Sequence, residues 1–304
     1  MRVVVTGATG LIGAAVCRKL AERGDEVVGL SRDRKPAQRR FPDYEWHSWW
    51  PETEPAPTRA ISGADAVINL VGETINQRLT RAAKKRIRES RVDATNNLVR
   101  AIAAADHPPG VLISQSAIGR YGDTGDALVD EDTPADQGDF LGRLTVEWED
   151  AAMAAASHGL RVVITRSGHV LAPEGGFLGE LLPPFKIGIG GPIAGGRQYV
   201  SWIHIDDAAG LALYLLDNED ASGAVNSTAP NPVTNKELSK AIGRTLRRPA
   251  IAPIPEIALW PLKGRELAHA IATGQRVLPR WAIELGYRFK FPELEPALKN
   301  LLRR

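Results

Sequence analysis

The sequence has little of several features that mark particular protein classes. Cys17 is its one cysteine among 304 residues, which excludes both an intramolecular disulfide and a cysteine-rich metal site. The 38 Lys and Arg residues nearly balance the 36 Asp and Glu residues. A net charge of +2 gives no electrostatic reason to expect nucleic acid or an anionic membrane as the main partner. No apolar run approaches the roughly 20 residues of a membrane-spanning helix.

The N-terminal segment also lacks the apolar core of a secretory signal peptide. The three valines at 3–5 are followed by Thr6 and Gly7, and this run is too short for such a core. Hydrophobic residues make up 43% of the chain, which is ordinary for a globular protein with a substantial core. We therefore expect a cytoplasmic, enzyme-like protein that acts on a small molecule, with no bound metal, no nucleic acid and no membrane as partners.

Strand and helix patterns alternate along most of the chain. The β-branched or apolar runs that predict strands are 2–6, 26–30, 64–70, 111–114, 161–165 and 223–227. Helical spacing of apolar residues is found at 11–23, 80–105 and 142–157. This alternation favours right-handed crossovers. The predicted fold class is α/β: a Rossmann-like, doubly wound parallel sheet with a smaller C-terminal substrate-side α/β portion.

Glycine and proline are concentrated in two stretches. Residues 173–196 are dense in glycine, and residues 249–261 contain four prolines. Both residue types interrupt regular structure, so we expect irregular, surface-lining segments there.

A glycine-rich turn joins the first predicted strand to the first predicted helix. Its glycines are Gly7, Gly10 and Gly13, spaced Gly-x-x-Gly-x-x-Gly. In this strand–turn–helix context such glycines allow a tight turn, close approach of a pyrophosphate and close helix packing. The N-terminus of the helix offers free N–H groups to the phosphates. We assign dinucleotide contacts to the three glycines and to Thr9, Leu11 and Ile12.

The end of the second predicted strand bears on the choice between NAD and NADP. An acid there holds the ribose 2′-hydroxyl of NAD, whereas an arginine accommodates the 2′-phosphate of NADP. Ser31 and Arg32 stand at this position, and a guanidinium matches phosphate geometry. We predict NADP (NADPH) as the cofactor. Asp33 is the counter-argument, since it could take the role of the acid if the strand ran further.

Several strings resemble the extended branch of the short-chain dehydrogenase/reductase superfamily, the NAD(P)-dependent epimerases and dehydratases. Besides the glycine turn, they are the segments 65–73, 114–117, 166–173 and 202–207. More narrowly, the chain looks like an uncharacterised subgroup of NADP-binding, epimerase-like proteins. The stretches that carry this narrower likeness are 72–75 continuing to 90–91, then 182–192, 274–279 and 285–287.

The resemblance implies further cofactor contacts. It assigns Leu70 and Val71 to the cofactor, with Gly72 beside them, and Val170 to the nicotinamide end. Ser114, at the end of the next strand, receives the same assignment. Arg91 is implied to reach the cofactor pocket; the alternative is a surface cation with a partner such as Asp93.

The resemblance also divides the chain. A NADP-binding domain is expected at residues 1–169, with 201–230 returning to it. The substrate-side C-terminal domain is expected at 170–200 and 231–304.

The family's catalytic residues are only partly matched. Its members use a Ser or Thr that hydrogen-bonds the reacting oxygen, and a Tyr-x-x-x-Lys pair that transfers the proton. Ser116 falls on the serine position; the alternative is a hydroxyl that caps a strand end. The matching helix places Phe140 or Leu141 at the tyrosine, and neither can carry a proton. Leu144 or Thr145 stands at the lysine.

Tyr121 is the candidate replacement for the missing tyrosine. It lies on a loop five residues after Ser116, and Arg120 beside it could lower its pKa. The alternative is a packed loop aromatic. Two functions remain open: an NADP-dependent oxidoreductase or epimerase with a non-standard proton donor, and a non-catalytic NADP(H)-binding sensor or interaction protein.

Two other groups of residues have predominantly structural interpretations. The aromatic cluster at 46–51, with Trp46, Trp49 and Trp50, could form a partner surface or a ligand-stacking wall; the alternative is a loop packed over the sheet edge. His204 with the following pair of aspartates resembles a motif that ties the sheet to the substrate domain.

Overall fold

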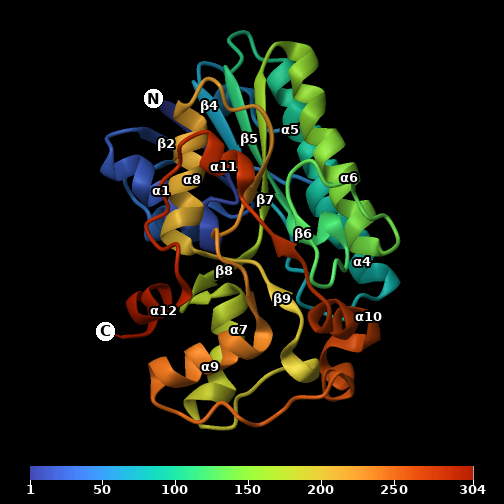
Figure 1. The fold of residues 1–304 in the computed structure, drawn as a ribbon. Helices are drawn as coiled ribbons and strands as arrows, with labels where there is room; N and C mark the ends of the chain where they lie inside the picture. The colour runs from blue at the N-terminus through green and yellow to red at the C-terminus, as the bar shows by residue number, and fades with distance from the viewer. Residues whose placement is uncertain (304) are drawn as a thin grey trace.

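The centre of the molecule is a seven-stranded sheet in which every pairing is parallel (Figure 1). The structure is a computed structural model, and it describes residues 1–303. The strands are β1 (Arg2–Thr6), β2 (Glu26–Ser31), β3 (Glu45–Ser48), β4 (Ala66–Asn69), β5 (Val111–Ala117), β7 (Arg161–Ser167) and β11 (Gly223–Ser227). Their order is β11-β7-β5-β4-β1-β2-β3, so the direction of winding reverses between β1 and β4. The predicted doubly wound α/β fold is confirmed.

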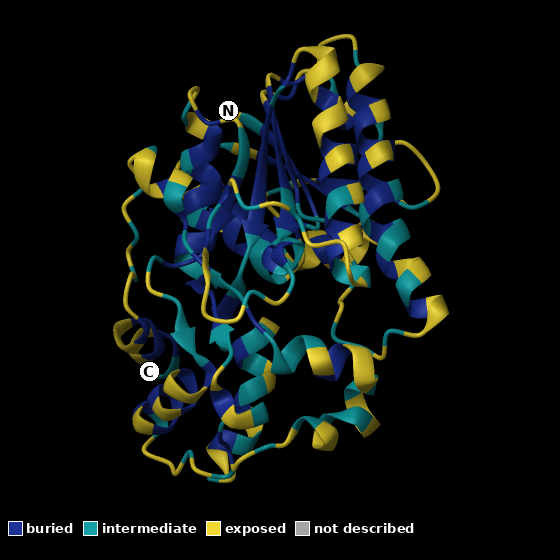
Figure 2. Cartoon of the chain, turned by 45° about the vertical axis from the view of Figure 1, so that its right-hand side comes forward, coloured by how far each residue is buried: buried dark blue, intermediate teal, exposed yellow. Residues whose placement is uncertain are grey.

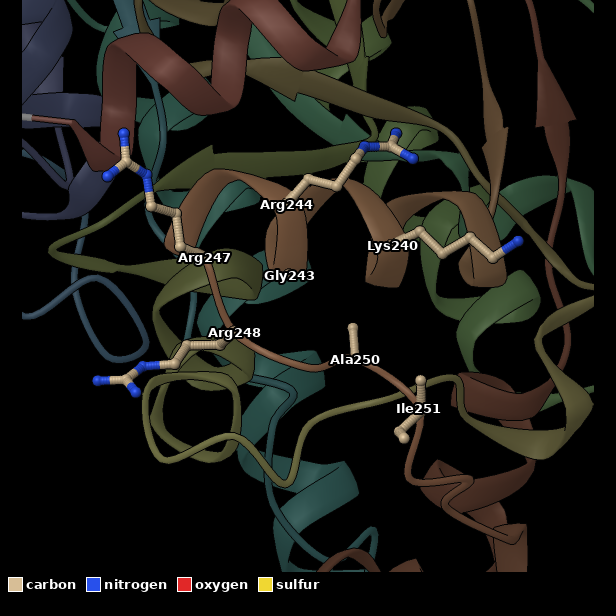
Figure 3. Close-up of a pocket in the computed structure, with 7 residues that line it drawn as sticks. All are labelled: Lys240, Gly243, Arg244, Arg247, Arg248, Ala250 and Ile251. Carbon is tan, nitrogen blue, oxygen red and sulfur yellow. The ribbon is translucent and has the colours of Figure 1, made fainter.

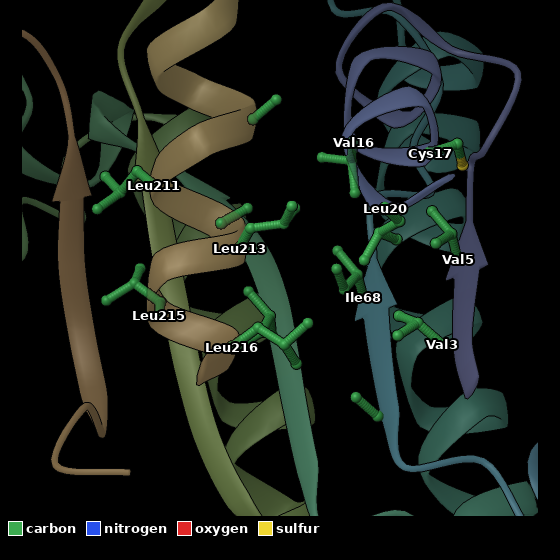
Figure 4. Close-up of a cluster of buried hydrophobic side chains, with 14 of the residues drawn as sticks. Val3, Val5, Val16, Cys17, Leu20, Ile68, Leu211, Leu213, Leu215 and Leu216 are labelled. Carbon is green, nitrogen blue, oxygen red and sulfur yellow. The ribbon is translucent and has the colours of Figure 1, made fainter. Parts of the chain in front are cut away.

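Helices cover both faces of the sheet because successive strand residues point to opposite sides. Val3 and Val5 of β1 pack on the side of α1 (Leu11–Glu22) and α8 (Ile205–Asp217), as Figure 4 shows. Val4 points to the other side, toward α3 (Thr58–Ile61), α5 (Ala94–Ala103) and α6 (Phe140–Met153). Figure 2 shows the strands buried between these layers. Because the sheet is buried on both faces, apolar and polar residues do not alternate along its strands.

The tryptophan cluster lies partly in the sheet and partly in the segment that follows the edge strand. Residues 45–48 form the edge strand β3, which pairs with β2. Trp46 and Trp49 are buried, whereas Trp50 is half exposed. The ring of Trp46 lies over Gly29, where a Cβ would come within 2.4 Å of it. The short strand escaped prediction because its four residues include no β-branched residue.

The long helix expected at 80–105 is interrupted. It consists of α4 (Arg81–Arg88), one turn of π-helix (Glu89–Asp93) and α5. Thr80 caps its start by accepting the backbone N–H of Ala83 at 3.2 Å. A π-turn adds a residue to the helical repeat and is often found at functional sites.

The C-terminal portion has its own hydrophobic core. It is built by α7 (Gly176–Lys186), α9 (Asn235–Leu246) and α12 (Leu294–Leu302). The expectation of an irregular segment throughout 173–196 is wrong for α7, even though this helix contains Pro183 and Pro184. Apolar residues recur at helical spacing along α7 and are buried: Leu178, Leu182 and Phe185. Their burial outweighs the loss of the two backbone N–H donors that the prolines lack.

Smaller elements connect the two portions. Three short strand pairs are β6 (Leu128–Val129) with β13 (Arg276–Val277), β8 (His169–Ala172) with β10 (Trp202–His204), and β9 (Tyr199–Val200) with β12 (Val233–Thr234). The remaining helices are α2 (Arg34–Arg40), α10 (Trp260–Ala272) and α11 (Arg280–Glu284).

The last strand of the sheet is supplied late in the chain. β11 pairs with β7, where the sequence predicts a late strand at 223–227. Ala282 in α11 and the nearby Tyr287 and Phe289 pack on the sheet core beside α8. The domain boundaries at 169, 200 and 230 stay a prediction. Within residues 1–303, none of the helices is long and apolar enough to cross a membrane.

Candidate cofactor and active site

The glycine turn after β1 is too tightly packed to admit side chains. Gly7 has φ +62°, and a Cβ on it would lie 2.6 Å from the carbonyl oxygen of Leu70. A Cβ on Gly13 would lie 2.2 Å from the carbonyl oxygen of Gly7, and one on Gly10 would lie 3.1 Å from the same atom. Gly7 therefore makes the tight turn, and Gly13 allows α1 to approach it.

The N-terminus of α1 is free of competing side chains. Gly10 is the N-cap of α1, so no side chain caps the helix. The first turn of α1 contains no acidic residue. Thr9, Gly10 and Leu11 line a cavity of about 450 Å³ that also contacts Arg18 and Arg40 and, among its other lining residues, the acids Glu174 and Asp206. Free N–H groups, a positive helix end and two guanidiniums make this region suited to a phosphate.

After β2 the one acid caps a helix, whereas the neighbouring Arg32 is exposed. Asp33 accepts the backbone N–H of Lys35 at 3.0 Å and so caps α2. Ser31 donates its hydroxyl to the carbonyl of Asp33 at 3.1 Å. Arg32 is exposed, and Arg40 donates to the carbonyl of Thr9 at 3.2 Å. Because capping engages Asp33, the geometry favours the arginine interpretation of this strand end.

A buried hydrogen-bond network supports the ends of β1, β4 and β5. Thr6 donates to Asn69 at 2.7 Å, and the amide of Asn69 donates to Ser114 at 3.1 Å and to Thr95 at 3.0 Å. The backbone N–H of Leu70 donates to the Thr6 hydroxyl at 3.0 Å. The Ser114 hydroxyl thus lies inside this network, where it fixes the point at which the chain leaves β4.

Arg91 lies in the π-turn, against the end of β4. The nearest atoms to a Cβ on Gly72 would be those of its guanidinium, with Cζ at 3.2 Å, so the structure brings these two predicted residues together. Val71 directly precedes Gly72 and is partly exposed. Arg91 donates to the carbonyl of Ile87 at 3.2 Å and stands over the ring of Trp148.

The charge of Arg91 is poorly compensated. Burial lowers its pKa to about 10, and the charge of Glu73 offsets only part of this effect. Within residues 1–303 no carboxylate forms an ion pair with it. A desolvated guanidinium without a bidentate partner favours an anion beside it.

Val170 lies next to the glycine turn. It packs in one apolar cluster with Leu11 and Ile12, so these three predicted cofactor residues come together. The ring of the preceding His169 contacts that of Phe177 in a tilted arrangement with centroids 4.3 Å apart, and burial lowers the pKa of His169 to about 4. The imidazole is therefore neutral at pH 7.

Ser116 is held by a buried carboxylate. Its hydroxyl donates to Oε1 of Glu149 at 2.7 Å. Glu149 also receives a bidentate pair of bonds from Arg166, each 2.9 Å long, and lies 3.3 Å from Nη1 of Arg120. Ser116 is 1% exposed. Its donor hydrogen is committed to Glu149, so its oxygen can serve a ligand only as an acceptor.

Tyr121 belongs to the same network. Its hydroxyl donates to Oδ1 of Asn226 at 2.8 Å and accepts from Nη1 of Arg166 at 2.9 Å. The residue is 3% exposed, and burial raises the pKa of its hydroxyl in spite of the nearby arginine. Transfer of its proton to a substrate requires the bond to Asn226 to break first.

The residues that the sequence comparison placed at the tyrosine and lysine positions are non-protic or engaged. Phe140 begins α6 and lies under the ammonium of Lys84. Leu144 is buried, and the hydroxyl of Thr145 donates to the carbonyl of Gly142 at 2.7 Å. Leu141 lies against the backbone of Gly119.

His204 and Asp207 connect α8 to the C-terminal segment. His204 accepts the backbone N–H of Asp206 at 3.0 Å and stacks on Phe291. The carboxylate of Asp207 accepts the backbone N–H groups of Lys290 and Phe291 at 2.7 and 2.9 Å. These contacts agree with the structural interpretation of the motif. Residues 1–303 hold no group of three potential metal ligands.

Sequence reasoning did not single out Glu149, Arg166 or Asn226 as members of the network. The one local indication was Glu149 itself, a charged residue at a buried position of α6 beside Trp148 and Ala152. Its partners Ser116 and Arg166 come from β5 and β7, and Asn226, which accepts from Tyr121, comes from β11; no local pattern connects these strands to α6.

Comparisons with known proteins agree on one family. The NAD dependent epimerase/dehydratase family model matches residues 3–227, and a domain of unknown function, DUF1731, matches residues 254–301. The bovine epimerase family protein SDR39U1 is 39% identical over 306 residues, covering 99% of this chain and all of that protein. The crystal structure of human SDR39U1 (isoform 2) with NADPH is 36% identical, with a TM-score of 0.89 and coverage of 99% of both chains. A nucleoside-diphosphate sugar epimerase from Corynebacterium glutamicum is 31% identical, with a TM-score of 0.78 and coverage of 99% of this chain and 58% of that one.

Proposed function

Because the chain belongs to the NAD dependent epimerase/dehydratase family, we propose that it binds NADPH across the carboxyl ends of β1, β2 and β4. The observation that carries this proposal is the glycine turn, where Cβ atoms on Gly7 and Gly13 would clash with backbone, beside an uncapped helix N-terminus. The similar human protein was crystallised with NADPH.

Each predicted contact has a place in this proposal. Gly7, Thr9, Gly10 and the first turn of α1 hold the pyrophosphate, and Ser31 and Arg32 hold the 2′-phosphate. Leu70, Val71 and Gly72 line the site at β4, with Arg91 as an additional cation and Ser114 supporting the strand end. Val170 lies at the nicotinamide end. When bound, NADPH supplies a hydride; the protein binds and orients.

The reaction proposed is that of an NADP-dependent oxidoreductase or epimerase with a non-standard proton donor. None of the five tyrosines in the sequence is followed four residues later by a lysine. Ser116 and Tyr121 are the protic groups assigned to the reacting oxygen. In this proposal Tyr121 donates its proton to the substrate carbonyl oxygen after its bond to Asn226 has opened. Ser116 donates to the same oxygen only after its bond to Glu149 has opened; while that bond is intact, Ser116 accepts from a neighbouring substrate hydroxyl.

A second function, NADP(H) binding without turnover, is supported by the same network. Both candidate hydroxyls are buried and bonded to protein groups, and burial raises the pKa of Tyr121 away from the range useful to a proton donor. A protein of this kind would report the redox state of the NADP pool through a partner.

The cofactor assignment predicts a preference for NADPH over NADH. We expect NADPH to bind at least about tenfold more tightly, since a 2′-phosphate gains charge-assisted hydrogen bonds from Arg32. Arg32→Asp should remove most of this preference, measured by fluorescence titration with each nucleotide. Arg39→Asp, an equal charge change on exposed α2, is the matched control. Equal affinity of the native protein for both nucleotides contradicts the assignment of NADP.

Turnover separates the two functions. We expect the purified protein to oxidise NADPH with some members of a panel of carbonyl compounds and nucleotide sugars, followed by absorbance. Tyr121→Phe should reduce the rate by about two orders of magnitude or more, as loss of a general acid does, with unchanged NADPH affinity. Tight NADPH binding with no turnover across the panel favours the non-catalytic function, whereas full activity of Tyr121→Phe rules out Tyr121 as the donor.

A further inference from the structure

The far end of the C-terminal portion combines exposed isoleucines with cations. Ile187, Ile189 and Ile251 are 72%, 59% and 83% exposed. They lie on two segments, 186–191 and 247–255, that contain Lys186, Arg247 and Arg248 but no Asp or Glu. We call these six residues the cationic isoleucine tip. Isoleucine is among the residues most often buried, so three such side chains close together in solvent require an explanation.

Backbone contacts hold the two segments side by side. The N–H of Ala252 donates to the carbonyl of Gly190 at 3.3 Å, and the N–H of Ile254 donates to that of Pro192 at 2.9 Å. A Cβ on Gly190 would meet the ring of Phe185 in the core. Ile189, its neighbour on the extended chain, therefore points outward.

Figure 3 shows how the cations are arranged around this segment. Ala250 points toward α9, where Gly243 leaves room for it, and Ile251 points away from the helix. Arg247 and Arg248 extend to one side, and Lys240 and Arg244 to the other. The charged groups are spread over a surface rather than aimed at one point, which fits an extended anionic partner better than a single small anion.

The cations of the tip have no acidic partners of their own. Arg244, on the rim, pairs with Glu295. Within residues 1–303 no ion pair joins Lys186, Arg247 or Arg248 to a carboxylate. Unpaired cations around protruding isoleucines are complementary to a lipid surface, where apolar side chains enter the interface and cations meet anionic headgroups.

We propose that the cationic isoleucine tip docks reversibly on an anionic lipid surface. The near-zero net charge of the whole chain predicted that a membrane is not a partner. A net charge is a sum over the chain, so it does not reveal a local group of cations such as the tip. Docking at the tip leaves the glycine turn, on the sheet, accessible to solvent and ligand. The proposal does not depend on the cofactor or on catalysis.

Vesicle sedimentation tests the proposal with the full-length protein. Vesicles of phosphatidylcholine with phosphatidylglycerol should pellet the protein, and vesicles of phosphatidylcholine alone should not. Replacing the three isoleucines together (Ile187→Ser, Ile189→Ser, Ile251→Ser) should weaken the binding about tenfold or more, through loss of apolar insertion. Lys186→Gln with Arg247→Gln and Arg248→Gln should remove the preference for anionic vesicles.

The control carries the same chemical change elsewhere. Ile257→Ser with Leu262→Ser and Ile283→Ser removes three other exposed aliphatic side chains and should leave vesicle binding unchanged. Thermal unfolding of each variant checks that the fold is intact. If neither kind of vesicle pellets the protein, the proposal is overturned. That result is also the one expected if the tip binds an acidic protein and not a lipid surface. Equal pelleting of all variants overturns it as well, since binding then does not involve the tip.

Discussion

Replacing Gly13 by alanine is expected to abolish most NADPH binding. The new Cβ would lie 2.2 Å from the carbonyl oxygen of Gly7 and 2.9 Å from Cα of Ala8, and all of these are backbone atoms without a rotamer to change. Either α1 moves away from the turn or the turn deforms. Overpacking of this kind costs about 1–3 kcal/mol. If all of it appears as lost binding, the affinity falls by up to about two orders of magnitude, since each 1.4 kcal/mol is tenfold.

Titration of Gly13→Ala with NADPH, together with urea unfolding, measures both consequences. Gly110→Ala is the matched control: its Cβ would have 3.9 Å to the nearest atom, and its backbone does not have a positive φ. We expect this variant to bind NADPH and to unfold like the native protein. A Gly13→Ala variant with native affinity would show that the glycine turn is not where the nucleotide binds.

Replacing Arg166 by alanine is expected to give the largest loss of stability. Glu149 would remain in the interior with Ser116 and a longer contact to Arg120, and Tyr121 would lose a donor. Side chains of this ion pair are only 6% and 8% exposed. Removing one partner of a buried pair typically costs about 3–5 kcal/mol, because the other charge stays buried without compensation.

Chemical denaturation at neutral pH measures this loss. The matched control is Arg244→Ala, which removes an arginine from an ion pair with Glu295 whose side chains are 63% and 53% exposed. An exposed pair contributes about 0–1 kcal/mol, so the control should barely change the unfolding midpoint. A similar small change in Arg166→Ala would contradict this prediction and would mean that Arg120 or water compensates the charge of Glu149.

The glycine turn and the sheet could be predicted from the sequence because their causes are local. Gly7, Gly10 and Gly13 stand between a β-branched run and an amphipathic helix, and each is required by a neighbour within the same turn or at the adjoining strand end. The six predicted strands all occur in the sheet, since a strand buried on both faces is apolar along its length.

The parts that escaped prediction depend on distant residues. α7 contains two prolines that argue against a helix, and only its packing on α9 and α12 explains it. The π-turn adds one residue to a helical repeat that apolar spacing alone does not show. Glu149, Arg166 and Asn226 meet only because α6, β7 and β11 converge, so the environment of Ser116 and Tyr121 could not be derived before the fold was known.

The order in which the sheet is covered has a consequence for synthesis on the ribosome. α1 ends at Glu22, whereas α8, which completes the cover of the same face, begins at Ile205. At about 5–20 residues per second, an interval of roughly ten to forty seconds separates their appearance. Val111 and Ile113 are synthesised before Ile205 by an interval of roughly 5 to 19 seconds, and Val163 by roughly 2 to 8 seconds, and until α8 appears they present an uncovered apolar face. We expect this uncovered face to be a binding surface for chaperones while the chain is still being synthesised.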